Sequence, residues 1–383
     1  MARFGAEHLG AFFDQEVNPG AAERDETRTV IPRSTFTRAA EIGLLNYLLP
    51  SDVGGLDGSR RLFGLLLEQV GYYSEDPSYG TMLAMFADVP NVIYRAHGPA
   101  APILTDRYVR PMARGELLGT FAYTDYGDAF AFQARCRQDG DGFVLHGVKC
   151  LQTGGELADL FVVYVRDEQN GMKVFLLERD QPGLSLTPVT TMGHRSAGLT
   201  QLHMDDVRVP ASHLLSTQDG LADAQVFLNS RRIYVVCPLV GVMQRTTELC
   251  TSHLGTVIRE GRPLTQAQTV QARLGNMSAR CQCAQAILHA ALDRIDRGEV
   301  NDVFDPFISS AKFMLTEHAV EVCERAIRLT GWRGYSDELP FGRFYRAAMG
   351  ALTGQTAQDV LEIQLGVIAI AQQELSLHVK GTT

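Results

Sequence analysis

The chain has 383 residues, of which 45% are hydrophobic and 21% are charged, and its formal net charge is −9. This balance is typical of a globular protein with an extensive core, and the negative net charge argues against a nucleic-acid or anionic-membrane partner, since no basic tract offsets it. No stretch is apolar for long enough to span a bilayer, because Glu362 and Gln364 interrupt the best candidate, residues 360–371. The N-terminus lacks the pattern of a secretory signal.

The first third of the chain has the apolar spacing of helices, at residues 4–16, 33–45 and 60–73. Glycine and proline make residues 43–59 a turn-rich connection. We therefore expect a helical domain over residues 1–117.

The middle of the chain has the character of β-strands. Apolar residues cluster or alternate in FAY, FVLHG and LFVVYV between residues 119 and 166, and DGDG at residues 139–142 is a hairpin signal. Further short strands are expected up to about residue 215, and Pro210 is suited to end one of them because it lacks a backbone donor. The prediction is a β-barrel or sandwich domain over residues 118–221.

Helical spacing returns after residue 222 and persists to the C-terminus. Four long helices are predicted at residues 222–254, 264–298, 306–331 and 341–378, and their short connections indicate an antiparallel four-helix bundle over residues 222–383. The predicted fold class is therefore α+β, with a β-domain between two helical domains.

Seven cysteines without regular pairing indicate a reducing compartment, which predicts a cytoplasmic protein. Cys281 and Cys283 lie two residues apart on a predicted helix and face different ways, so we expect structural cysteines and no metal site.

Three segments of the β-region carry a resemblance to a known family. FAYTDYG (121–127), DGDGFVLHGVKCLQT (139–153) and ADLFVVYVR (158–166) follow one another as matching segments do in the middle domain of acyl-CoA dehydrogenases. The exit, Val207 to Pro210, also resembles that family, and the order of domains agrees over essentially the whole chain. The resemblance implies the acyl-CoA dehydrogenase fold and an FAD cofactor.

The same resemblance places a flavin seat in the β-domain. Thr124 and Thr153 match the two family threonines that lie against the flavin, and the implied contact residues beside them are Tyr123, Asp125, Leu151 and Gln152. Asp125 stands where the family has glutamate, and Leu151 replaces an aromatic residue that would cover the flavin face.

Two further flavin motifs of the family fall in the predicted bundle. The residues that match them, or replace a contact there, are Arg259, Gln268, Arg328, Gly331 and Gly334. In the first motif Val257 and Glu260 replace the arginine and phenylalanine that grip the cofactor in the partner subunit. In the second, Trp332 and Arg333 add bulk between the two glycines.

The catalytic glutamate of the family has no counterpart. It aligns with Gln355 without a gap, or with Gly354 if one residue is deleted, and neither side chain accepts a proton as a carboxylate does. Asp359 is the nearest acidic residue, and a solvated or capping role suits it equally well. Thr356 and Gln358 continue the motif and are implied flavin contacts.

In the first bundle helix, Arg232 matches an arginine that the family keeps near the substrate channel. The neighbouring position holds the base in some members, and here it is Arg231, which cannot serve as one.

The leading hypothesis is a flavin-dependent α,β-dehydrogenase of an acyl thioester, carried on coenzyme A or on a carrier protein and belonging to secondary metabolism. Family habit implies a homodimer or homotetramer. A flavin monooxygenase of the same fold remains an alternative, since it needs no glutamate base. A flavin-free acyl-binding enzyme or an inactive partner subunit is the third possibility, because fold alone does not decide chemistry.

Overall fold

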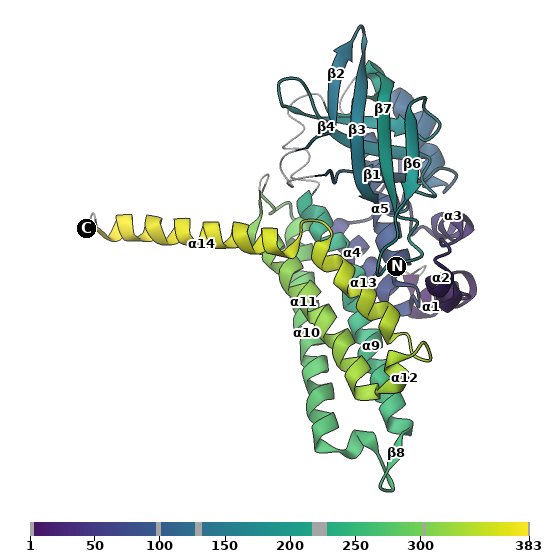
Figure 1. The fold of residues 1–383 in the computed structure, drawn as a ribbon, viewed down its shortest axis with the longest axis vertical. Coiled ribbons are helices and arrows are strands. Elements are labelled where there is room, and N and C mark those ends of the chain that lie inside the picture. Colours follow the sequence, from purple (N-terminus) through teal and green to yellow (C-terminus); the bar gives the residue numbers. More distant parts are fainter. Residues whose placement is uncertain (1–3, 97–100, 127–131, 217–227, 302–303, 382–383) are drawn as a thin grey trace. The chain divides into compact units, whose positions relative to one another are not determined.

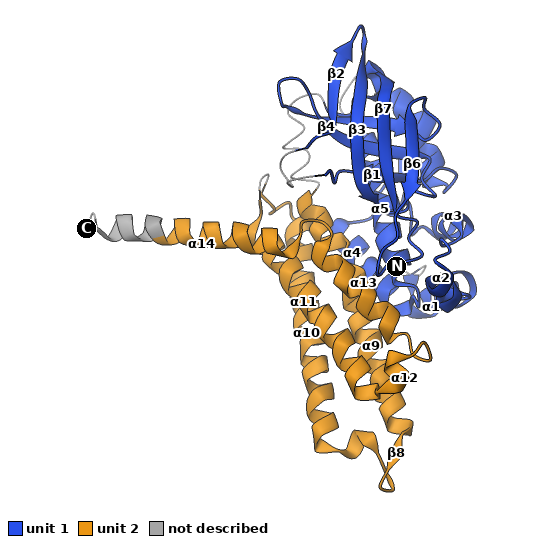
Figure 2. Cartoon of the chain, viewed as in Figure 1, with its two compact units in different colours: residues 1–224 blue, residues 225–383 orange. Residues whose placement is uncertain are grey.

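The computed structural model describes residues 4–96, 101–126, 132–216, 228–301 and 304–381 (Figure 1). The chain divides into two compact units, residues 1–224 and 225–383 (Figure 2). The predicted boundary at residues 221 and 222 lies outside the described residues. Within the described part of the chain, none of the helices has the length and apolar character that a bilayer crossing requires.

The first unit begins with helices, as predicted. Their bounds are α1 (Ala6–Phe12), a π-helical turn (Phe13–Val17), α2 (Ala21–Thr27), α3 (Arg33–Ile42), α4 (Arg60–Tyr73), α5 (Pro77–Arg95), α6 (Ala101–Leu104) and α7 (Arg110–Ala113). Asp76 caps α5 by accepting from the amide of Ser78, and its carboxylate also binds Arg24 and Ser196. Because Ser196 belongs to the β-region, this buried group joins the helices to the sheet.

A seven-stranded sheet follows in the described residues. Its strands are β1 (Gly119–Ala122), β2 (Arg135–Asp139), β3 (Gly142–Gln152), β4 (Leu160–Arg166), β5 (Met172–Glu178), β6 (Leu184–Pro188) and β7 (Thr200–Pro210). The order is β1-β4-β2-β3-β7-β6, with β5 also paired to β4. The DGDG segment makes the β2–β3 hairpin, and β7 ends at Pro210, so both of these predictions are confirmed.

The sheet core is a cluster of buried apolar side chains from β2, β3, β4, β5 and β7, among them Leu145, Phe161, Phe175 and Val207. On β4, six consecutive residues from Leu160 to Val165 are buried, which explains the continuous apolar run in its sequence. Helix α5 packs against β1. Strands β1 and β3, which carry the predicted flavin seat, are thereby held by the core and by α5.

The second unit is helical. Residues 228–234 form a helical stretch, and the helices that follow are α9 (Cys237–Thr256), α10 (Gln268–Asp296), α11 (Pro306–Thr330), α12 (Trp332–Tyr335), α13 (Phe341–Thr353) and α14 (Gln358–Gly381). A short hairpin, β8 (Ile258–Arg259) and β9 (Arg262–Pro263), connects α9 to α10. Helices α9, α10, α11 and α13 pack against one another, which confirms the predicted bundle.

The predicted continuous helix over residues 341–378 is wrong at one place. The chain leaves the helical conformation at residues 354–357, so α13 packs along α11 whereas α14 points away from the bundle (Figure 1). Gln355 and Thr356 have φ angles of +51° and +82°, in the left-handed region that non-glycine residues rarely adopt. Each such residue costs on the order of 1–2 kcal/mol, so other contacts must hold the turn.

The left-handed conformation predicts the sign of one substitution. Gln355→Gly should leave stability unchanged or raise it by up to about 1 kcal/mol, because glycine adopts positive φ without strain. In a continuous helix the same change would cost about 1 kcal/mol. Urea unfolding measures the difference, with Ala351→Gly in α13 as the matched helical control, which should be destabilised. A loss in Gln355→Gly as large as in the control would contradict the observed turn.

Candidate functional site

The end of β3 places three of the predicted flavin contacts. The pairing of β3 with β7 shifts register between Lys149 and Gln152, and Leu151 has a φ angle of +56°. This irregularity turns the Leu151 side chain outward, where it is 48% exposed, while Gln152 is fully buried. Thr153 follows at the strand end and is half-buried. Both polar atoms of the Gln152 side chain are buried without a hydrogen-bond partner among the described residues.

The segment after β1 lies directly beside this end of β3. The carbonyl oxygen of Thr124 accepts a hydrogen bond from the amide of Cys150 at 2.8 Å, and Asp125 forms an isolated bridge with Lys149. Thr124 is exposed. Among the described residues, neither its hydroxyl nor that of Thr153 takes part in a hydrogen bond within the protein. The structure thus brings together the two segments that bear these threonines, and their unused hydroxyls fit the heteroatoms of a flavin.

A buried ion pair underlies this surface. The Lys149 ammonium lies 3.3 Å from the Asp125 carboxylate, and the side chains are 0% and 2% exposed. Lys149 also donates to the carbonyl of Tyr123 at 3.1 Å and lies 3.8 Å from the ring centroid of Phe132. Burial lowers the pKa of Lys149 to about 8, although Asp125 opposes this shift. The pair fixes the backbone of the segment that presents Thr124.

Asp125 is satisfied from a second side as well. Its Oδ2 accepts from the backbone amides of Gln133 and Ala134 at 3.0 and 2.9 Å. Asp125 was predicted as a flavin contact, and the structure places its carboxylate inside the protein, facing Lys149. Lys149 is not among the residues expected at the site, and its signal in the sequence is a lysine placed between Val148 and Cys150 in β3.

In the bundle, two cationic side chains converge on Thr356. Arg232 approaches the Thr356 hydroxyl with Nη2 at 3.1 Å and Nε at 3.4 Å, and Lys312 donates to the Thr356 carbonyl at 3.0 Å. Arg232 is 3% exposed and Lys312 is fully buried. Arg232 also donates to Asn229 at 2.7 Å. Arg232 and Thr356, both predicted, therefore lie together, and Lys312 joins them although it was not predicted.

Gln358 anchors the start of α14 to α11. Its amide oxygen accepts from Lys312 at 3.3 Å and from Thr316 at 3.2 Å, and its amide nitrogen donates to Glu317 at 3.1 Å and to the carbonyl of Phe313 at 3.0 Å. Gln358 is an expected flavin contact, and in the structure only 8% of the residue is exposed. Both lone pairs of its oxygen and both hydrogens of its amide nitrogen are thus used inside the bundle.

The two positions that the resemblance offers for the family glutamate, Gly354 and Gln355, lie in the same turn. Gly354 is exposed and Gln355 is half-buried. Asp359 lies in the first turn of α14 and is exposed, where a carboxylate stabilises a helix N-terminus. This arrangement accounts for Asp359 without a catalytic role.

The remaining predicted contacts lie at the other end of the bundle. Arg259 in β8, Gln268 at the start of α10 and Arg328 near the end of α11 are all exposed, and Arg328 pairs with Glu324 at 2.6 Å. Figure 1 shows β8 and α12 together at this end, away from the start of α14.

Gly331, between α11 and α12, has φ 62° and ψ −137°, a conformation essentially restricted to glycine. Gly334 is buried, and a Cβ there would lie 2.0 Å from the Thr330 hydroxyl. The neighbouring Trp332 is 66% exposed, with the Arg333 guanidinium 5.5 Å from its ring centroid. Both glycines are thus required by the local backbone, whether or not a ligand is bound.

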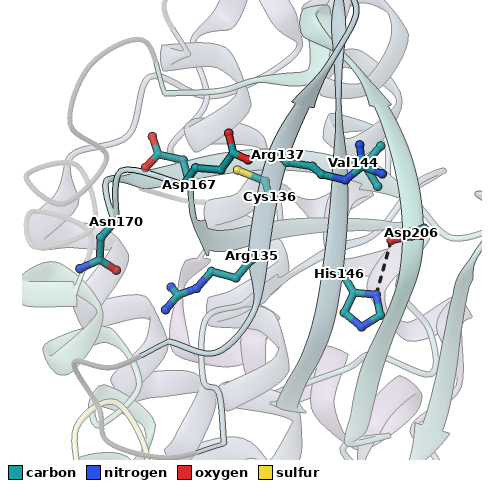
Figure 3. Close-up of a pocket in the computed structure, with 9 residues that line it drawn as sticks. Arg135, Cys136, Arg137, Val144, His146, Asp167, Asn170 and Asp206 are labelled. Carbon is teal, nitrogen blue, oxygen red and sulfur yellow. Dashed lines mark ion pairs between the residues drawn. The ribbon is translucent and has the colours of Figure 1, made fainter.

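A hollow of about 430 Å³ lies elsewhere, on the β2–β3 side of the sheet (Figure 3). Its lining mixes both charges, with Arg135, Arg137 and His146 near Asp167 and Asp206, and His146 lies 3.6 Å from Asp206. None of the predicted site residues lines it.

Comparison with known proteins gives a consistent result along the chain. Family models described as the N-terminal, middle and C-terminal domains of acyl-CoA dehydrogenase match residues 5–116, 124–207 and 218–369. Cyclohex-1-ene-1-carbonyl-CoA dehydrogenase from Geobacter metallireducens is 28% identical over 344 residues, which are 87% of this chain and 88% of that protein.

Solved structures show the same fold. The prolyl acyl carrier protein oxidase AnaB superposes with a TM-score of 0.89 at 21% identity, covering 96% of this chain and 98% of that one. A glutaryl-CoA dehydrogenase from Mycobacterium smegmatis, solved in complex with FADH2, has a TM-score of 0.87 at 22% identity, with coverage of 94% and 92%.

The buried ion pair makes a prediction about the β-domain. Asp125→Ala should destabilise the protein by about 3–5 kcal/mol, because it leaves the Lys149 ammonium buried without its carboxylate. Asp139→Ala, which removes the exposed partner of Arg208, should cost less than about 1 kcal/mol. The free energy of unfolding in urea measures both changes. The double variant Asp125→Ala/Lys149→Met should recover much of the loss, and a strictly additive double variant would contradict a coupled pair.

Proposed function

Because the chain belongs to the acyl-CoA dehydrogenase family, and its homologues are oxidoreductases, we propose that it is a flavin-dependent α,β-dehydrogenase of an acyl thioester. The adjacency of the Thr124 and Thr153 segments carries the proposal, because the Thr124 carbonyl accepts from the Cys150 amide and neither threonine hydroxyl is used by the described part of the protein. Bound FAD supplies the hydride acceptor. The named relatives act on coenzyme A or carrier-protein thioesters, and either carrier suits this proposal.

The residues of the chain itself divide the remaining work. Lys149 and Asp125 hold the segment that bears Thr124, so the flavin seat is formed before the cofactor binds. In the bundle, Arg232 and Lys312 hold Thr356 and thereby the turn that contains Gln355. The Gln355 amide can donate or accept a hydrogen bond but cannot take the α-proton. The enzyme should therefore favour thioesters whose α-proton is readily lost.

Assembly into a homodimer or homotetramer is part of the proposal. Large apolar side chains at Ile363, Val367 and Ile370 are 61–67% exposed and recur at helical spacing along one side of α14. Such a stripe supports contact with a second copy of the chain.

A monooxygenase reaction on the same scaffold is the second candidate. It is favoured by the neutral pair Gly354 and Gln355, because oxygenation by reduced flavin does not require a carboxylate base at this position. Oxygen consumption that depends on an added flavin reductase, and that proceeds with thioesters that fail to bleach the flavin anaerobically, would favour it.

The direct test is anaerobic mixing of the flavin-loaded protein with a panel of acyl thioesters on coenzyme A and on a carrier protein. Bleaching of the oxidised flavin band, together with the α,β-unsaturated product, is the expected result. A protein that binds flavin and is not bleached by any thioester in the panel would argue against dehydrogenation.

Restoring a carboxylate should accelerate the same reaction. One of the two variants Gly354→Glu and Gln355→Glu is expected to raise the anaerobic bleaching rate by about 10²–10⁴-fold, the usual contribution of a placed general base. The variant that responds identifies which position is the counterpart of the family glutamate. Asp359→Asn should change the rate less than twofold, since its carboxylate is exposed on α14. A large loss in Asp359→Asn, with no gain from either glutamate, would make Asp359 the base.

The only tryptophan in the sequence gives a test of cofactor binding that does not depend on activity. FAD added to flavin-free protein should quench the fluorescence of Trp332 in a saturable manner, because the exposed ring adjoins Gly331 in the predicted flavin segment. Riboflavin at equal absorbance controls for optical filtering, and Trp332→Phe controls for the source of the signal. Saturable FAD binding that leaves Trp332 emission unchanged would place the cofactor away from this segment.

A further inference from the structure

A charged lysine buried beside the turn at residues 354–357 is not explained by the packing of the bundle alone. Lys312 is fully buried, with a residue exposure of 0%. Its ammonium donates to two neutral oxygens, the carbonyl of Thr356 at 3.0 Å and the amide oxygen of Gln358 at 3.3 Å. Burying a cation against neutral acceptors is unfavourable compared with an apolar side chain of similar size. The lysine therefore has a role other than simple stabilisation.

The two bonds span the turn in which the base would lie. Thr356 is the second of the two left-handed residues, and Gln358 is the first residue of α14. The Lys312 side chain on α11 is thus hydrogen-bonded to the residues on both sides of Ala357. Arg232 grips the same turn from another helix, through the Thr356 hydroxyl. Gln355, immediately before Thr356, is positioned by these contacts although neither cation bonds to its side chain in the described hydrogen bonds.

We propose that Lys312 is a positioning residue that holds the Thr356 carbonyl and Gln358, and so fixes where the turn presents Gln355 to the acyl thioester. This assignment rests on the proposed function for the identity of the substrate. The two hydrogen bonds from Lys312 to Thr356 and Gln358, which we call the clamp, are a property of the bundle itself. Lys312 does not touch the substrate in this scheme. It acts through the backbone of the turn.

The protonation state of Lys312 affects how firmly the turn is held. Burial, and then the neighbouring positive charge of Arg232, lower the pKa of Lys312 to about 8, and the negative charge of Glu317 opposes them. An ammonium donates stronger hydrogen bonds than a neutral amine. The turn is thus held more firmly below about pH 8 and less firmly above it. Arginine at this position would keep its charge over the whole range.

The experiment compares Lys312→Met and Lys312→Arg with the wild-type protein by amide hydrogen exchange. Lys312→Met should speed the exchange of amides in residues 354–361 by about tenfold, while the β-domain amides keep their rates. Lys312→Arg should preserve most of the protection. Lys173→Met, which removes a lysine from β5, is the matched control and should leave the turn unchanged. Unaltered exchange at residues 354–361 in Lys312→Met would overturn the proposal.

The pH profile provides the second readout. In wild-type protein, thioester-dependent flavin bleaching should decline as the pH rises through about 8, and in Lys312→Arg this decline should be absent. Identical profiles in the two proteins would overturn the pH-dependent part of the clamp. If no thioester bleaches the wild-type flavin while Lys312→Met still loosens residues 354–361, the proposed function fails and the clamp stands. The global unfolding midpoint of Lys312→Met should not fall sharply, since a buried charge has been removed.

Discussion

Thr356 accepts hydrogen bonds from two buried cationic side chains, Arg232 and Lys312, which lie on different helices. The turn between α13 and α14 depends on these bonds. Left-handed conformations at two successive non-glycine residues are unfavourable by themselves. The hydrogen bonds from Arg232 and Lys312 to Thr356 compensate, because each is made by a charged donor in a setting sheltered from water. The helical spacing of apolar residues in the sequence runs across residues 341–378 without marking this turn. The direction of α14 is therefore a consequence of these tertiary bonds.

The β-domain also contains a buried lysine that donates a hydrogen bond to a backbone carbonyl. Lys149 and Lys312 are both fully buried, both donate to a backbone carbonyl, and both hold a segment that the family resemblance assigns to the site. They differ in their partners, since Lys149 faces the Asp125 carboxylate whereas Lys312 faces neutral oxygens. In each case the lysine is fully buried and holds the segment through a hydrogen bond to a backbone carbonyl.

Much of the fold could be predicted from periodicity, because the signals were strong and local. The DGDG hairpin, the apolar run of β4 and the boundaries of α4 at Arg60–Tyr73 follow directly from residue patterns. The break at residues 354–357 could not, since Gln355 and Thr356 have no strong turn propensity and their conformation comes from tertiary bonds. By contrast, the order of the motifs along the chain implies that the Thr124 and Thr153 segments lie together. A buried lysine reads in a sequence as a surface residue.

The positive charge beside the turn bears on the proposal that Gly354 and Gln355 stand where the family has its catalytic glutamate. A carboxylate near Arg232 and Lys312 would have its pKa lowered by both, so it would remain ionised but would be a weaker base. Neutral Gly354 and Gln355 do not supply that attraction, and burial, followed by the repulsion from Arg232, lowers the pKa of Lys312. Under the proposed function, a neutral residue at this position therefore changes the electrostatic balance of the whole turn in addition to removing a proton acceptor. The titration of Lys312 is where that change becomes measurable.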